Sequence, residues 1–134
     1  MIRESYRVVA PDRFLSTRFI DELVTITSSG TPVVKTGNAL ELVEGERAAV
    51  TYVPLNDVSG AILRESATRF QCRWKGEARY YDVNLPGGET ILDGAWAYPS
   101  APDELAAIRS RVAFDPAHFV EQFSTGGSLH DRTG

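Results

Sequence analysis

Short β-type segments separated by turn residues fill the first half of this chain, and this pattern limits it to a β-rich fold. Residues 23–27 and 31–35 are rich in β-branched side chains and flank the turn Ser28-Ser-Gly30, which predicts a hairpin. Residues 39–43 and 48–53 predict two further strands. Because turns rather than crossover helices join these strands, we expect the sheets to be antiparallel.

The second half continues the pattern with more aromatic side chains. Residues 68–75 alternate, which places Phe70, Cys72 and Trp74 on one face of a strand and charged or amide side chains on the other. Residues 62–66 fit either a short strand or a turn of helix. We then expect a turn at Gly76-Glu77 and a return strand at residues 78–85. A glycine-containing turn at 86–88 and a last long strand at 89–97 follow.

The two ends of the chain carry different signals. Residues 6–9 predict an edge strand that Pro11 stops, and residues 14–20 favour a helical turn. Near the C-terminus, Ser100 can cap a helix whose first turn contains Pro102 and an aspartate. The inward face of that helix is expected to carry Leu105, Ile108 and Val112.

The remaining C-terminal residues complete the predicted fold. We expect a final strand at 112–114, a second short helix from Asp115 with inward-facing apolar side chains (Phe119, Val120 and Phe123), and a loose tail at 124–134. The prediction is therefore a single mainly β domain over residues 1–134. Its architecture is expected to be a compact antiparallel two-sheet sandwich or a short open barrel, with one or two short helices near the C-terminus.

Composition excludes several classes of protein. The 134 residues carry a net charge of -4, which argues against a nucleic-acid partner. Apolar runs are too short for a membrane span, and the charged segment Met1-Ile-Arg-Glu argues against a signal peptide. The single cysteine cannot form an internal disulfide and favours a cytoplasmic location. We expect no membrane partner, and association of identical copies stays open.

The sequence offers no motif for a metal, a phosphate or a catalytic triad. One cysteine and two histidines cannot build a structural zinc site, so no metal is predicted. The glycine pairs Gly87-Gly88 and Gly126-Gly127 lack the strand and helix context of a phosphate-binding loop. No Ser/His/Asp arrangement stands out, and we predict no cofactor.

The aromatic side chains and the single thiol have two interpretations each. Cys72 lies between apolar neighbours on its strand face, which favours a buried, inert thiol over a nucleophile activated by Arg73. Phe70 and Phe114 are predicted core residues. The other aromatic side chains fit either a core or the wall of a ligand pocket, because their polar atoms need partners: Tyr52, Trp74, Tyr80 and Trp96.

Two charged residues complete the candidate site. Lys75 ends its strand at a turn, and Asp93 stands inside a strand, where aspartate is disfavoured. The pair fits either a surface salt bridge or a site in which the lysine holds an anionic group and the aspartate orients a ligand or accepts a proton.

A set of ordered matches resembles a known family. Its members carry a threonine, a cysteine, a lysine-glycine and a tyrosine, which correspond to Thr68, Cys72, Lys75-Gly76 and Tyr80. An aspartate, an alanine-tryptophan-x-tyrosine-proline run and a valine-alanine-phenylalanine follow, here Asp93, residues 95–99 and residues 112–114. The chain thus resembles the domain-of-unknown-function family 427 over residues 23–114. Arg73 departs from the family's proline. The family is catalogued as nucleotidyltransferase-like, but the glycine-serine and paired-carboxylate strand of that chemistry are absent.

Two functions remain open from the sequence. In the first, the chain binds or transforms a small polar molecule in an aromatic-lined pocket. The candidate ligand-binding residues are then Lys75, Tyr80, Asp93, Trp96 and Tyr52. In the second, the chain is a non-catalytic interaction or assembly domain, and the same aromatic side chains form its core or an interface. Convergence of the polar side chains on one cavity favours the first function.

Overall fold

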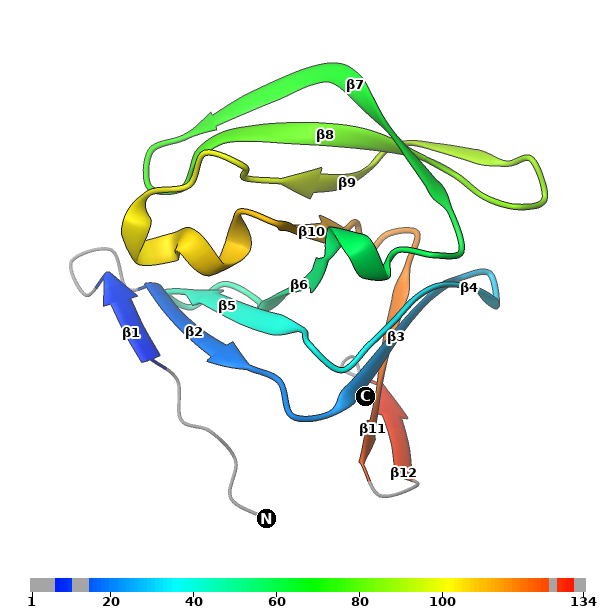
Figure 1. The fold of residues 1–134 in the computed structure, drawn as a ribbon, viewed down its shortest axis with the longest axis horizontal. Coiled ribbons are helices and arrows are strands. Elements are labelled where there is room, and N and C mark those ends of the chain that lie inside the picture. The colour runs from blue at the N-terminus through cyan, green and yellow to red at the C-terminus, as the bar shows by residue number, and fades with distance from the viewer. Residues whose placement is uncertain (1–6, 11–14, 126–127, 132–134) are drawn as a thin grey trace.

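The computed structural model describes residues 7–10, 15–125 and 128–131, and these residues fold into two antiparallel sheets (Figure 1). The larger, eight-stranded sheet has the order β1-β2-β5-β6-β10-β9-β8-β7. Its strands are β1 (Arg7–Ala10), β2 (Leu15–Phe19), β5 (Leu40–Glu44), β6 (Val50–Pro54), β7 (Ile62–Cys72), β8 (Gly76–Asn84), β9 (Thr90–Ala97) and β10 (Arg111–Phe114).

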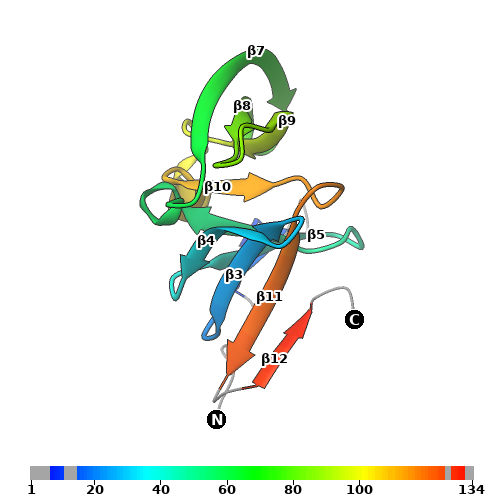
Figure 2. The same ribbon diagram turned by 90° about the vertical axis from the view of Figure 1, so that its right-hand side faces the viewer.

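The smaller sheet has the order β12-β11-β3-β4 and packs against one face of the larger one. Its strands are β3 (Leu23–Ser28), β4 (Thr31–Thr36), β11 (Val120–Thr125) and β12 (Ser128–Asp131). In Figure 2 these strands lie below β10, while β7, β8 and β9 rise on the other side. Two short 3-10 helices, η2 (Leu55–Asp57) and η3 (Asp103–Ile108), complete the described elements. No helix among these elements is long and apolar enough to cross a membrane.

Successive residues of the central strands feed two separate cores. On β6, Val53 belongs to the core that the two sheets share, whereas Tyr52 belongs to a second core on the opposite face. The same alternation separates Val112 from Ala113 on β10. Side chains of a strand point alternately to the two faces of a sheet, so both faces are covered at this point. The 3-10 helix η3 covers the second core with Leu105 and Ile108.

Much of the predicted β structure is confirmed. The hairpin of β3 and β4, the strands β5 and β6 and the turn at residues 86–88 lie where the sequence placed them. The edge strand expected at 6–9 is β1, although Tyr6 and Pro11 lie outside the described residues. The mainly β, two-sheet fold is confirmed, and the sheets do not close into a barrel.

The predicted helical segments are wrong. Residues 14–20 contain the strand β2, which pairs with β5 along its whole length. The helix expected from Ser100 is only the short η3, which starts after Pro102 and has no side-chain cap. Val112 lies in β10. Long-range strand pairing and burial override weak local propensities here.

Further differences concern the C-terminal region and β7. Asp115 begins a turn that leads into β11, so no second helix forms, and Phe119 and Phe123 are buried while Val120 is exposed. Part of the predicted tail is ordered, since β12 pairs with β11. Residues 62–72 form one strand, and its turn to β8 is at residues 73–75 rather than at 76–77.

Gly60 holds the connection before β7 against β4, and this contact generates a stability prediction. The Gly60 backbone N–H donates to the Val33 carbonyl at 3.0 Å. A Cβ at position 60 would lie 2.1 Å from the Pro32 carbonyl oxygen, a backbone atom that cannot rotate away. We predict that Gly60→Ala lowers the free energy of unfolding by about 1–3 kcal/mol because it overpacks this contact.

Gly37→Ala is the matched control, because nothing lies within 4 Å of its Cβ position. It should leave the urea midpoint nearly unchanged or slightly raised, since alanine restricts the unfolded chain. Equal midpoints for the two variants would contradict the tight packing of Gly60.

Candidate functional site

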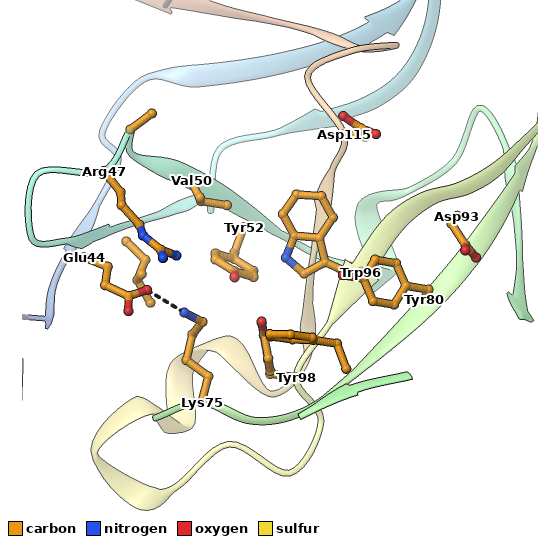
Figure 3. Close-up of a pocket in the computed structure, with 13 residues that line it drawn as sticks. Glu44, Arg47, Val50, Tyr52, Lys75, Tyr80, Asp93, Trp96, Tyr98 and Asp115 are labelled. Carbon is orange, nitrogen blue, oxygen red and sulfur yellow. Dashed lines mark hydrogen bonds and ion pairs between the residues drawn. The ribbon is translucent and has the colours of Figure 1, made fainter. Parts of the chain in front are cut away.

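A cavity of about 370 Å³ opens on the face of the large sheet that carries the second core. This volume is at the lower end of the range of about 300–1,000 Å³ that is typical of small-molecule sites. Its apolar and aromatic wall consists of Leu42, Ala48, Val50, Tyr52, Phe70, Tyr80, Trp96 and Tyr98. Its charged wall consists of Glu44, Arg47, Lys75, Asp93 and Asp115 (Figure 3).

The structure places all five sequence-predicted site residues in the wall of this cavity: Tyr52, Lys75, Tyr80, Asp93 and Trp96. That they bind a ligand stays a prediction. The predicted ligand-binding residues did not include Arg47 or Tyr98, although Tyr98 belongs to the set of polar aromatic side chains in the sequence. Tyr98 directly follows β9, two residues after Trp96, so continuing the alternation of that strand by one step was the signal for it. Arg47 lies in the β5–β6 loop, where no pattern distinguishes it from any solvated arginine.

Three aromatic side chains from β6, β8 and β9 form the floor and one side of the cavity. Tyr52 on β6 is only 1% exposed. Tyr80 on β8 and Trp96 on β9 face each other as a cross-strand pair, with ring centroids 6.4 Å apart and planes inclined by 40°. Tilted pairs at this separation stabilise the sheet and leave ring faces available for stacking. Tyr80 and Trp96 are half-buried, so part of each is open to the cavity.

Lys75 is a buried cation at one end of the cavity. Its side chain projects from the β7–β8 turn, and the residue is 8% exposed. The Lys75 Nζ lies 2.8 Å from the Glu44 Oε1 at the end of β5, and 5.5 Å from the centroid of the Tyr98 ring. Burying an ammonium group is costly without such a partner. The ion pair therefore ties the turn to β5 beside the cavity.

Two tyrosine hydroxyls lie next to this ion pair. Figure 3 shows the oxygens of Tyr52 and Tyr98 directed toward the same space as the Lys75 Nζ. Burial raises the pKa of both phenols well above their ordinary value. For Tyr52, a hydrogen bond with the Trp96 side chain acts in the opposite direction on the pKa. Both hydroxyls therefore stay protonated near neutral pH and can donate hydrogen bonds.

Asp93 holds β7 to β9 at the other end of the cavity. It is a non-glycine residue with φ of 50°, and its N–H donates to the Asp82 Oδ1 at 2.9 Å. Its carboxylate accepts hydrogen bonds from the Ser66 Oγ and the Thr68 Oγ1, each at 2.6 Å. These contacts fasten β7 where its register with β8 shifts, between Glu65 and Arg69. The backbone strain at Asp93 is thus compensated by three hydrogen bonds.

A salt bridge between Lys75 and Asp93, one of the two interpretations that the sequence left open, does not form. Lys75 pairs with Glu44, and Asp93 is bonded to the two hydroxyl side chains of β7. Figure 3 shows the two residues on opposite sides of the cavity, with the Tyr80 ring beside Asp93. The sequence could not distinguish these pairings, because Glu44 is far from Lys75 along the chain.

Three neighbouring predictions need correction. Phe70 was expected in the core but is 55% exposed, at the edge of the cavity. Cys72 is half-buried rather than buried, and it packs against the second core. Trp74 also packs there and does not line the cavity, and the Arg73 guanidinium lies 4.8 Å from its ring centroid. Within the described residues, no group of three His, Cys, Asp or Glu side chains could hold a metal ion.

Comparison with known proteins adds a family match. The model of the family described as a domain of unknown function (DUF427) matches residues 17–125. This stretch runs from β2 to the end of β11 and includes every residue of the cavity wall. No curated protein matches the chain.

The hydrogen bonds of Asp93 generate a pH prediction. Donation from Ser66, and then from Thr68, lowers the pKa of Asp93 below its ordinary value of 3.8. Its contribution to stability is therefore complete above that pH and is lost as the pH falls through the lower pKa of the folded state. We predict that Asp93→Asn lowers the urea midpoint at neutral pH, and that its difference from the wild type shrinks below about pH 4.

Asp103→Asn is the matched control, because that carboxylate is exposed and lies outside the cavity wall. Its difference from the wild type should be smaller at neutral pH. If the midpoint difference between Asp93→Asn and the wild type stays constant as the pH is lowered well below about 4, the stabilising role of the ionised Asp93 carboxylate is contradicted.

Proposed function

Because this chain belongs to the family described as a domain of unknown function (DUF427), we propose its function from the site itself. The proposed function is to bind a small polar molecule in the aromatic-lined cavity, or to bind such a molecule and transform it. The family description names no ligand, so the proposal depends on the chemistry of the wall. A cytoplasmic location is part of the proposal and is supported by the single cysteine.

The Tyr98 hydroxyl is the observation that carries the proposal. Tyr98 is 6% exposed and has no side-chain hydrogen bond within the part of the chain that the structure describes. The Tyr98 oxygen is not among the fully buried polar atoms that lack a partner in the described residues, so the hydroxyl is accessible from the cavity and can donate a hydrogen bond to a ligand there. Lys75 and Tyr52 point their polar atoms into the same space. Three donors of this kind can orient a polar ligand.

The other wall residues receive distinct roles. Trp96 and Tyr80 present ring faces on which a planar ligand can stack. Asp93 is proposed as a positioning residue, because its carboxylate already accepts two hydrogen bonds and its lowered pKa makes it a weak base at neutral pH. It holds β7 in place, and β7 carries Phe70 to the edge of the cavity.

The alternative function, an assembly domain, is supported by a different surface. Ile62 on β7 and Leu92 on β9 are 68% and 75% exposed. These two strands flank β8 on either side, and large exposed apolar side chains are typical of interaction surfaces. If identical copies associate through this surface, Leu92→Ser should weaken their association, and light scattering should then give a lower oligomeric mass than for the wild type. A mass that is monomeric in the wild type would count against this alternative.

A thermal-shift screen of polar metabolites tests the binding function. We predict that at least one compound raises the melting temperature of the wild type, and that Tyr98→Phe weakens its binding roughly fivefold, which corresponds to about one hydrogen bond. Tyr81→Phe is the matched control, because Tyr81 packs against the core between the sheets and does not line the cavity. Equal weakening in the two variants, or no stabilising compound, would refute the proposal.

A further inference from the structure

We infer that the ligand is a flat aromatic molecule that carries one carboxylate. The carboxylate is held at the end of the cavity where Arg47, Lys75 and Tyr98 lie, and the aromatic ring stacks on Trp96. This inference rests on the proposed binding function and specifies its ligand class.

Arg47, which is exposed, supplies a second positive charge to the cavity wall beside that of Lys75. Within the described part of the chain, no carboxylate forms an ion pair with it. Lys75, in contrast, is already neutralised by Glu44 at 2.8 Å. Figure 3 shows the Arg47 guanidinium directed toward the space that the Glu44–Lys75 pair borders. A guanidinium with parallel N–H donors matches the two oxygens of a carboxylate.

Hydrogen-bond donors outnumber free acceptors at this end. The hydroxyls of Tyr52 and Tyr98 are protonated donors there, beside the guanidinium of Arg47. The remaining acids are engaged or distant. Both oxygens of Asp93 accept hydrogen bonds, and Asp115 accepts from the Ala117 N–H at 2.9 Å and lies across the cavity from Lys75. A group with acceptors only, such as a carboxylate, fits this end.

The charge balance favours a monoanion. Glu44 cancels Lys75, so Arg47 alone supplies about one positive charge at this end. A carboxylate carries one negative charge near neutral pH, whereas a phosphate monoester carries about 1.5 to 2. A phosphate would therefore leave uncompensated negative charge next to Tyr52 and Tyr98, two residues that are themselves largely buried, whereas a carboxylate would not.

The aromatic side chains define the rest of the ligand. Trp96 and Tyr80 offer neighbouring ring faces, and Phe70 stands at the edge of the cavity with 55% of its surface exposed. An apolar ring that is this exposed beside a cavity gains free energy when a second apolar surface covers it. A flat ring between Trp96 and Phe70 would bury apolar surface, while its carboxylate reaches Arg47.

The chain allows a direct test, because Trp74 and Trp96 are its two tryptophans and Trp74 lies outside the cavity wall. In a Trp74→Phe background, intrinsic fluorescence reports on Trp96 alone. The probes are four molecules that share one phenyl ring: benzoate, benzamide, benzylammonium and phenyl phosphate. We expect benzoate to change the Trp96 fluorescence at concentrations at least tenfold lower than the other three require.

Two variants in the same background locate the carboxylate. Arg47→Gln should weaken benzoate binding about tenfold, to the level of benzamide, because a charge-assisted hydrogen bond is lost. Arg64→Gln is the matched control, since Arg64 is exposed on β7 and does not line the cavity. It should leave benzoate binding unchanged.

The outcomes separate this inference from the proposed function. If benzamide or benzylammonium binds as tightly as benzoate, the ligand does not need a carboxylate. If phenyl phosphate binds more tightly than benzoate, the site does not prefer a monoanion. Either result would overturn this inference but leave the proposed binding function intact. If no probe changes the fluorescence but some metabolites stabilise the protein in the thermal-shift screen, the inference of an aromatic carboxylate is overturned and the proposed binding function stands. No response in either experiment would refute both.

Discussion

The burial of β6, β10 and β9 on both faces is the constraint on which the rest of the structure depends. Val53, Val112 and Ala95 point into the core between the sheets, and the residues next to them on each strand point the opposite way. One face needs the small sheet as a cover, and the other needs η3 and the curled strands β7 and β8. The candidate site lies on this second face, so its rigidity comes from the same strands that form the core.

Two polar contacts hold the outer strands over that face. The Glu44–Lys75 ion pair joins β5 to the β7–β8 turn, and the Asp93 carboxylate joins β9 to β7. They lie at opposite ends of the cavity. Since β7 is an edge strand, its position depends on β8 and on these side-chain contacts rather than on a second neighbouring strand. The shape of the cavity is thus sensitive to few residues.

The cavity combines an aromatic floor with one polar end. Tyr52 and Tyr98 place hydroxyls at the boundary between these two parts, where burial keeps them protonated. Arg47 is exposed, so its charge acts from the mouth of the cavity, while the two hydroxyls offer hydrogen-bond donors deeper in the wall. This arrangement supports recognition by orientation, with the aromatic rings contributing contact area.

The sequence by itself determined the strand pattern, the turns and the set of polar aromatic residues, because alternation and turn chemistry are local properties. It predicted β3 to β6 and the residues Tyr52, Lys75, Tyr80, Asp93 and Trp96, which all line the cavity. Only the tertiary structure decided that residues 15–19 pair as a strand, that Lys75 bonds Glu44 rather than Asp93, and that Arg47 joins the site. These depend on contacts between residues far apart in the chain, for which local pattern carries no signal.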